Sequence, residues 1–140
     1  QLQPISQVAS GGEIARVMLS LKAMIAGAVK LPTIIFDEID TGVSGSIAEK
    51  MALIMQEMGK QNRQVISITH LPQIAAMADS HFEIEKQVEG TKTTTQIHPL
   101  DEEASIRELA RLLGGAQITD AVLENAREMK KLAGECKAGL

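Results

Sequence analysis

The spacing of apolar residues in the first half of the chain predicts two helices and two strands. Apolar side chains recur every three or four positions from residue 14 to residue 25, which predicts a helix that ends near residue 28. Residues 33–36 form a continuous apolar and β-branched run, which predicts a strand buried on both faces. Helical spacing returns at residues 47–58, and residues 65–69 predict a second buried strand. The order strand, helix, strand predicts a right-handed crossover and a parallel sheet.

The second half of the chain predicts a hairpin between helices. A short helix is expected at residues 73–77. Residues 82–88 and 93–97 alternate in polarity around a short turn, which predicts a β-hairpin with one face in water. Helical spacing then covers about residues 101–113 and 119–133. The expected fold class is α/β, with mainly parallel core strands, a β-hairpin and C-terminal helices.

Composition narrows the function classes. The chain has 140 residues, enough for one core, and a net charge of -4, which argues against an autonomous nucleic-acid surface because such surfaces cluster Lys and Arg. The single cysteine, Cys136, excludes an internal disulfide and is typical of a reducing cytoplasm. No apolar run approaches the roughly 20 residues that span a bilayer. We expect a cytoplasmic protein without a signal peptide, and a fragment, because the chain begins with Gln1.

Two carboxylates, Asp37 and Glu38, directly follow the first predicted strand. Adjacent acids at the tip of a buried strand lose hydration, so they usually have a metal ion or backbone donors as partners. One interpretation is a Walker B motif, in which Asp37 holds Mg²⁺ and Glu38 polarises the water that attacks a γ-phosphate. The alternative is a strand that ends in a solvated acidic turn.

The segment Ser10-Gly11-Gly12-Glu13 begins the first predicted helix. Serine with glutamate three residues later is a capping box, which needs no ligand. Two glycines in the first turn weaken that interpretation, because glycine is unfavourable in helices by about 1 kcal/mol relative to alanine. They also leave the helix amides open to a phosphate. Both interpretations can hold together.

His70 follows the second predicted strand. An isolated histidine is more often structural than catalytic. However, the carboxyl ends of neighbouring parallel strands meet at one edge of a sheet, where ligands bind, so His70 is expected near Asp37 and Glu38. It is therefore a candidate contact for a γ-phosphate. His81 and His98 lack partners at metal-ligand spacing, and no role is predicted for them.

Together the three segments resemble the ABC ATPase superfamily. Residues 9–13 resemble its signature motif, residues 33–38 its Walker B motif, and His70 its switch histidine. Their order and spacing are more specific than any one of them alone.

Within that superfamily the chain resembles the RecN family, SMC-like ATPases of bacterial DNA repair. The resemblance rests on residues 37–45, 68–75 and 106–115, and covers about residues 7–133. It implies that residues 1–140 are the C-terminal lobe of a P-loop (ABC-type) ATPase head. In that family two heads close around ATP, at the ends of coiled-coil arms that act in double-strand-break repair.

The resemblance also implies residue roles. Asp37 would hold Mg²⁺, Glu38 would be catalytic, and His70 would sense the γ-phosphate. Residues of the signature motif would bind the ATP of a second head: Ser10, Gly11, Gly12 and Glu13. A D-loop would lie between the heads: Asp40, Thr41, Gly42, Val43, Ser44 and Gly45. Many related ATPases end this loop with Asp where the present chain has Gly45, which puts communication between the two sites through that residue in doubt.

The Walker A pattern G-x-x-x-x-G-K-[ST] does not occur in the sequence. ATP and Mg²⁺ binding is therefore expected to require an N-terminal lobe of the same protein, and this chain alone is expected to be inactive. Expected partners are that lobe, a second head, and DNA through the full-length protein. Two alternatives remain: a non-catalytic binding or dimerisation module, and the ATPase subunit of an ABC transporter.

Overall fold

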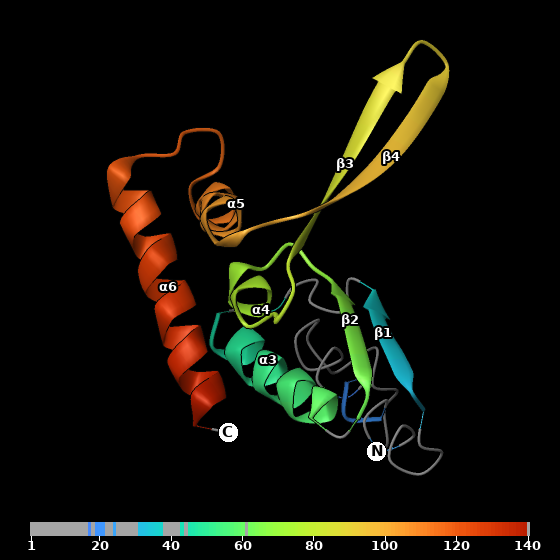
Figure 1. Cartoon of the computed structure of the whole chain (residues 1–140), viewed down its shortest axis with the longest axis vertical. Coiled ribbons are helices and arrows are strands. Elements are labelled where there is room, and N and C mark those ends of the chain that lie inside the picture. Colours follow the sequence, from blue (N-terminus) through green and yellow to red (C-terminus); the bar gives the residue numbers. More distant parts are fainter. Residues whose placement is uncertain are drawn as a thin grey trace, which may run out of the picture.

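The computed structural model describes residues 17, 19–21, 24, 31–37, 43, 45–60 and 62–139, and Figure 1 shows their arrangement. Its elements follow the predicted order: β1 (Thr33–Asp37), α3 (Gly45–Gly59), β2 (Gln64–Ile68), α4 (Pro72–Ala76), β3 (Phe82–Glu89), β4 (Lys92–Pro99), α5 (Glu102–Gly114) and α6 (Asp120–Ala138). The described residues of the first predicted helix are helical too, and Leu19 among them is fully buried.

The strands β1 and β2 pair in parallel, which confirms the predicted sheet. Their register runs from Thr33 opposite Gln64 to Asp37 opposite Ile68. The helix α3 connects the two strands and contacts β2. Ile34 and Phe36 of β1 point into the core and are 7% and 0% exposed.

The prediction that both strands are buried on both faces is wrong for the described part of the chain. Alternate residues of β1 and β2 face water: Ile35 is 54% exposed, Ile66 40% and Ile68 36%. The side on which Ile34 and Phe36 lie is covered, whereas these three side chains lie on surfaces that no described residue covers fully. These short runs rich in apolar and β-branched residues thus predicted the strands correctly, but not the number of covered faces.

The hairpin β3–β4 extends away from the other elements (Figure 1). Its strands pair antiparallel from Phe82 opposite Pro99 to Glu89 opposite Lys92, and Gly90 allows the tight turn with a φ of 61°. The expected single wet face is wrong, because nearly every residue of both strands is exposed. The large apolar residues that face water here are Phe82, Ile84, Val88 and Ile97.

The helices α5 and α6 pack against each other and against α4. Each begins at a side-chain cap: Asp101 Oδ1 accepts from the Ala104 amide at 2.8 Å, and Thr119 Oγ1 accepts from the Val122 amide at 3.3 Å. The core that they close with α3 contains four buried methionines: Met51, Met55, Met58 and Met77. None of the helices that the structure describes is long and apolar enough to cross a membrane.

Candidate functional site

The carboxyl edge of the parallel strands brings Asp37 and the segment of His70 together. Asp37 is the last residue of β1 and pairs with Ile68, the last residue of β2, two residues before His70. Both Asp37 and His70 are exposed. The edge therefore presents a carboxylate and an imidazole to solvent from adjacent strands, which is the arrangement that the sequence predicts.

The turn after β2 fixes where His70 leaves the sheet. Thr69 Oγ1 accepts a hydrogen bond from the Leu71 amide at 3.0 Å. The Leu71 carbonyl then accepts from the amides of Ile74 at 3.2 Å and Ala75 at 3.1 Å, which begins α4. Pro72 occupies the first turn of α4, where the missing N–H costs nothing. The strand thus ends at a defined point, with His70 held between a bonded threonine and a helix start.

The end of the predicted D-loop lies against α4. Val43 is half-buried and packs on the core, and Gly45, which the sequence places in a loop, is the first residue of α3. The sequence predicted a later start for this helix, because the helical spacing of apolar residues begins only at Ile47. The remaining candidate residues lie outside the described residues: Ser10, Gly11, Gly12, Glu13, Glu38, Asp40, Thr41, Gly42 and Ser44.

Gln73 of α4 is a polar residue at this edge to which the sequence analysis gave no role. A Cβ built on Gly45 would lie 3.3 Å from Gln73 Nε2, so the amide occupies the space beside the first residue of α3. Gln73 Oε1 is buried, and no described residue donates a hydrogen bond to it. All its helix neighbours, Pro72, Ile74, Ala75 and Ala76, are buried. One polar residue in an otherwise apolar five-residue helix is the signal that points to it.

A second polar cluster lies between β3, α5 and α6, around the buried side chain of Ser105. Ser105 is 1% exposed, and its Oγ lies 2.7 Å from His81 Nδ1 and 2.7 Å from Lys130 Nζ. An ammonium can only donate, so Ser105 Oγ accepts from Lys130 Nζ. The same hydroxyl can donate to His81 Nδ1 or accept from it, depending on the tautomer of the imidazole.

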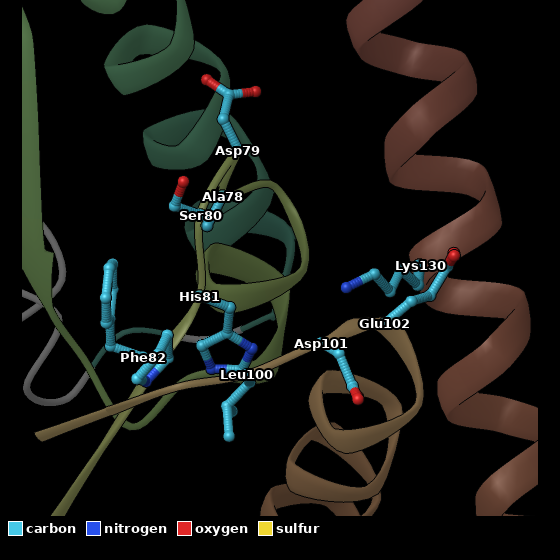
Figure 2. A pocket seen from close by; sticks show the side chains of 10 residues that line it. Ala78, Asp79, Ser80, His81, Phe82, Leu100, Asp101, Glu102 and Lys130 are labelled. Atoms are coloured by element: carbon cyan, nitrogen blue, oxygen red, sulfur yellow. The ribbon is translucent and has the colours of Figure 1, made fainter.

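Burial lowers the pKa of His81 below its usual range, and the neighbouring charge of Lys130 lowers it further. Burial likewise lowers the pKa of Lys130. His81 and Lys130 line a cavity of about 320 Å³ at the base of the hairpin (Figure 2). Ser105 lies 24 residues from His81 and 25 residues from Lys130 in the sequence, so residue spacing alone gave no indication of this cluster.

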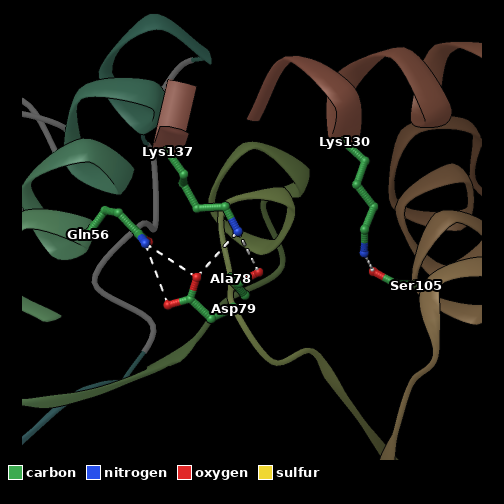
Figure 3. Close-up of polar contacts among 6 residues, drawn as sticks. All are labelled: Gln56, Ala78, Asp79, Ser105, Lys130 and Lys137. Atoms are coloured by element: carbon green, nitrogen blue, oxygen red, sulfur yellow. Dashed lines mark hydrogen bonds and ion pairs between the residues drawn. The ribbon is translucent and has the colours of Figure 1, made fainter. Parts of the chain in front are cut away.

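The same region is tied together by further polar contacts (Figure 3). Lys137 donates to the Ala78 carbonyl at 3.2 Å and lies 3.4 Å from Asp79 Oδ1. Gln56 of α3 donates to the same carboxylate at 3.4 Å. These contacts anchor the end of α6 to the segment that follows α4, so the cluster is a structural joint between helices.

The described residues contain no group of three or more His, Cys, Asp or Glu side chains that could hold a metal ion. Mg²⁺ that binds with a nucleotide needs no such group, because it is held through one or two carboxylates together with phosphate oxygens and waters. The exposed carboxylate of Asp37 is a hard oxygen ligand of that kind. Asp37 therefore fits a Mg²⁺ ion that binds together with a nucleotide.

No family model matches the sequence. The chain is similar to DNA repair protein RecN of Bacillus subtilis, with 42% identity over 136 residues, which is 97% of this chain and 23% of the relative. It is 45% identical to DNA repair protein RecN of Vibrio cholerae over 128 residues, 91% of this chain and 23% of the relative. The chain thus spans less than a quarter of the length of these relatives.

A solved structure described as "Structural biochemistry of ATP-driven dimerization and DNA stimulated activation of SMC ATPases" shares the fold. The TM-score is 0.62 and the sequence identity 23%, over 79% of this chain and 66% of that one. The fold class predicted from the sequence, α/β with parallel core strands, a β-hairpin and C-terminal helices, is confirmed.

Proposed function

The chain belongs to the RecN family over the part of those proteins that it spans, and from this premise we propose that it supplies half of a composite ATP-hydrolysing site. The parent protein would be an SMC-like ATPase of DNA double-strand-break repair. The observation that supports this most directly is the parallel register that sets Asp37 beside Ile68 and the turn that carries His70. The relatives favour this proposal over a transporter subunit.

The chemistry of such a site is phosphoryl transfer to water, which depends on positioning and on charge neutralisation more than on covalent catalysis. Mg²⁺, when bound with ATP, would neutralise charge on the β- and γ-phosphates. Asp37 would hold that ion, Glu38 would orient and polarise the attacking water, and His70 would contact the γ-phosphate. Residues 10–13 would reach the ATP of a second head, and residues 40–45 would lie between the heads.

An N-terminal lobe of the same protein is the first partner that we propose. Ile35, Ile66 and Ile68 are partly exposed on a parallel pair, an arrangement that is normally buried on both faces. The sequence has no phosphate-binding Walker A loop, and the relatives extend well beyond the matched region. A lobe that covers these side chains and brings that loop would complete both the sheet and the site.

The other proposed partners belong to the full-length protein. A second head would close the composite site, and DNA would be contacted by the complete cytoplasmic protein and weakly or not at all by this chain, whose net charge is -4. The arms and the assembled dimer, rather than this lobe, would carry the basic surface that phosphate binding requires.

The substitution Glu38→Gln in the full-length protein tests the proposal. It keeps the size of the side chain but removes the carboxylate that polarises water. We expect ATP binding to be retained and turnover to fall by about a hundredfold or more. Glu49→Gln, an exposed glutamate of α3, is the matched control and is expected to leave turnover unchanged. Normal turnover by the Glu38→Gln protein would refute the assignment.

A further inference from the structure

Gln73 has two features that a purely structural side chain in its place would not need. Its Nε2 fills the space beside Gly45, at the start of α3, and its Oε1 is buried without a donor among the described residues. Buried polar atoms in native proteins are nearly always hydrogen-bonded, and one that is not calls for an explanation. A methionine would fill a similar volume in this apolar helix without leaving an acceptor unpaired.

The position of Gln73 joins two segments that the proposed function assigns to the ATP site. It lies three residues after His70, in the helix that the turn at Leu71 and Pro72 begins. Its amide lies against Gly45, where the predicted D-loop ends and α3 starts. Gly45 has no side chain, and the amide of Gln73 from the neighbouring segment takes the space beside it.

We propose that Gln73 is a positioning residue that couples the segment of His70 to the end of the D-loop within one head. This inference rests on the proposed function. Its Oε1 is kept for an N–H or O–H donor that reaches it only when nucleotide is bound at the assembled site, so the acceptor stays unpaired in the nucleotide-free protein. Gly45 is the complement of Gln73, because any side chain at position 45 presses on the amide.

The substitution Gln73→Met in the full-length protein separates the two possible roles. It removes the unpaired acceptor and keeps the bulk, so the melting temperature of the nucleotide-free protein should stay the same or rise. If Gln73 positions the site, kcat for ATP should nevertheless fall about three- to tenfold, the range expected for a residue that transmits coupling, while KM changes less than twofold. A higher stability together with a lower kcat is an outcome that a structural role does not produce.

The substitution Gly45→Ala disturbs the same contact, between positions 45 and 73, by changing residue 45 instead of Gln73. Its Cβ would lie 3.3 Å from Gln73 Nε2, which displaces the end of a flexible side chain and leaves the backbone in place. We expect a similar fall in kcat, and no additional fall when Gly45→Ala is combined with Gln73→Met, because contacting residues are not additive. Gly59→Ala is the matched control: it ends the same helix, and nothing lies within 4 Å of its added Cβ.

The outcomes distinguish this inference from the proposed function. If the parent hydrolyses ATP and both Gln73→Met and Gly45→Ala keep its kcat, Gln73 is structural and the coupling role is refuted. If the two effects on kcat are fully additive, the contact between positions 45 and 73 does not transmit them, and the inference also fails. If the parent neither binds nor hydrolyses ATP, the proposed function itself fails, and this role fails with it.

Discussion

The two polar regions of this lobe differ in how completely their groups are paired. Around Ser105 no buried side-chain polar atom of the described residues lacks a partner: Ser105 Oγ lies 2.7 Å from both His81 Nδ1 and Lys130 Nζ. At the carboxyl edge of the strands, Asp37 faces solvent, and Gln73 Oε1 is buried without a donor among the described residues. A closed network stabilises the fold, whereas an edge with unpaired groups has capacity for a ligand or a partner.

The largest effect is expected from a substitution at the exposed edge, which should lower ATP turnover without lowering stability. Asp37→Asn in the full-length protein removes the charge that would hold Mg²⁺, so ATP turnover should fall by about a hundredfold or more. Because Asp37 is exposed at the end of β1, the melting temperature should change little. A steady-state ATPase assay paired with a thermal melt checks both. If turnover survives, Asp37 does not hold the ion.

The opposite pattern is expected from the closed network. Ser105→Ala leaves His81 Nδ1 and Lys130 Nζ without their shared partner in a buried place, and should cost about 1–3 kcal/mol of unfolding free energy. Turnover per folded molecule should stay near the parent value. Denaturant unfolding measures the loss of unfolding free energy, with Ser80→Ala, at an exposed serine, as the control. A loss no larger than that of the control would contradict the structural role of the network.

The pH dependence of folding stability tests the same network without a substitution at Ser105. The pKa of His81 is lowered in the folded state by burial and by Lys130, so the unfolded chain takes up a proton first as pH falls through about 6.5. Folding stability should therefore decline below about pH 6.5 and level off below the lowered folded pKa. The slope is at most about 1.4 kcal/mol per pH unit. In His81→Gln this part of the slope should vanish, and an unchanged slope would contradict its assignment to His81.

The smallest effect is expected at the rim of the α5–α6 contact. Arg127 pairs with Glu103 at 3.1 Å, but both side chains are about half exposed or more. Arg127→Ala should cost about 0.5 kcal/mol or less, since water and salt screen such pairs. Arg107→Ala, at an exposed arginine of α5 that pairs with no described residue, is the comparison. A loss above about 1 kcal/mol would mean that this rim belongs to the closed network.

The hydrophobic pattern predicts the elements of the fold well and their surroundings less well. The strands of residues 33–36 and 65–69 form as expected, yet Ile35 and Ile66 are exposed, because periodicity reports local conformation and not which lobe covers a face. The helix α6 runs past its predicted end at residue 133 to Ala138. Its last turn is held by the contact of Lys137 with Ala78 and Asp79, which are distant in sequence.

The sequence likewise predicted one part of the candidate site and missed another. The meeting of Asp37 with the His70 segment follows from the topology rule for parallel strands, and the register confirms that placement. The approach of Gln73 to Gly45 and the pairing of His81 with Ser105 depend on packing between segments far apart in sequence, which neither spacing nor composition encodes. The roles of all candidate site residues stay predictions, and residues 10–13 and Glu38 also lie outside the described part of the chain.

The central claim, that this lobe carries one half of a composite site, is tested most directly by calorimetry with ATP and Mg²⁺. The titration is made on this chain alone and on the chain mixed with the N-terminal lobe of the same protein, with Asp37→Asn as the control in the mixture. Binding in the mixture only, and its weakening by Asp37→Asn, is the predicted result. No binding in a mixture whose two parts are folded and associated would contradict the claim, and would indicate a module that keeps these motifs for its structure.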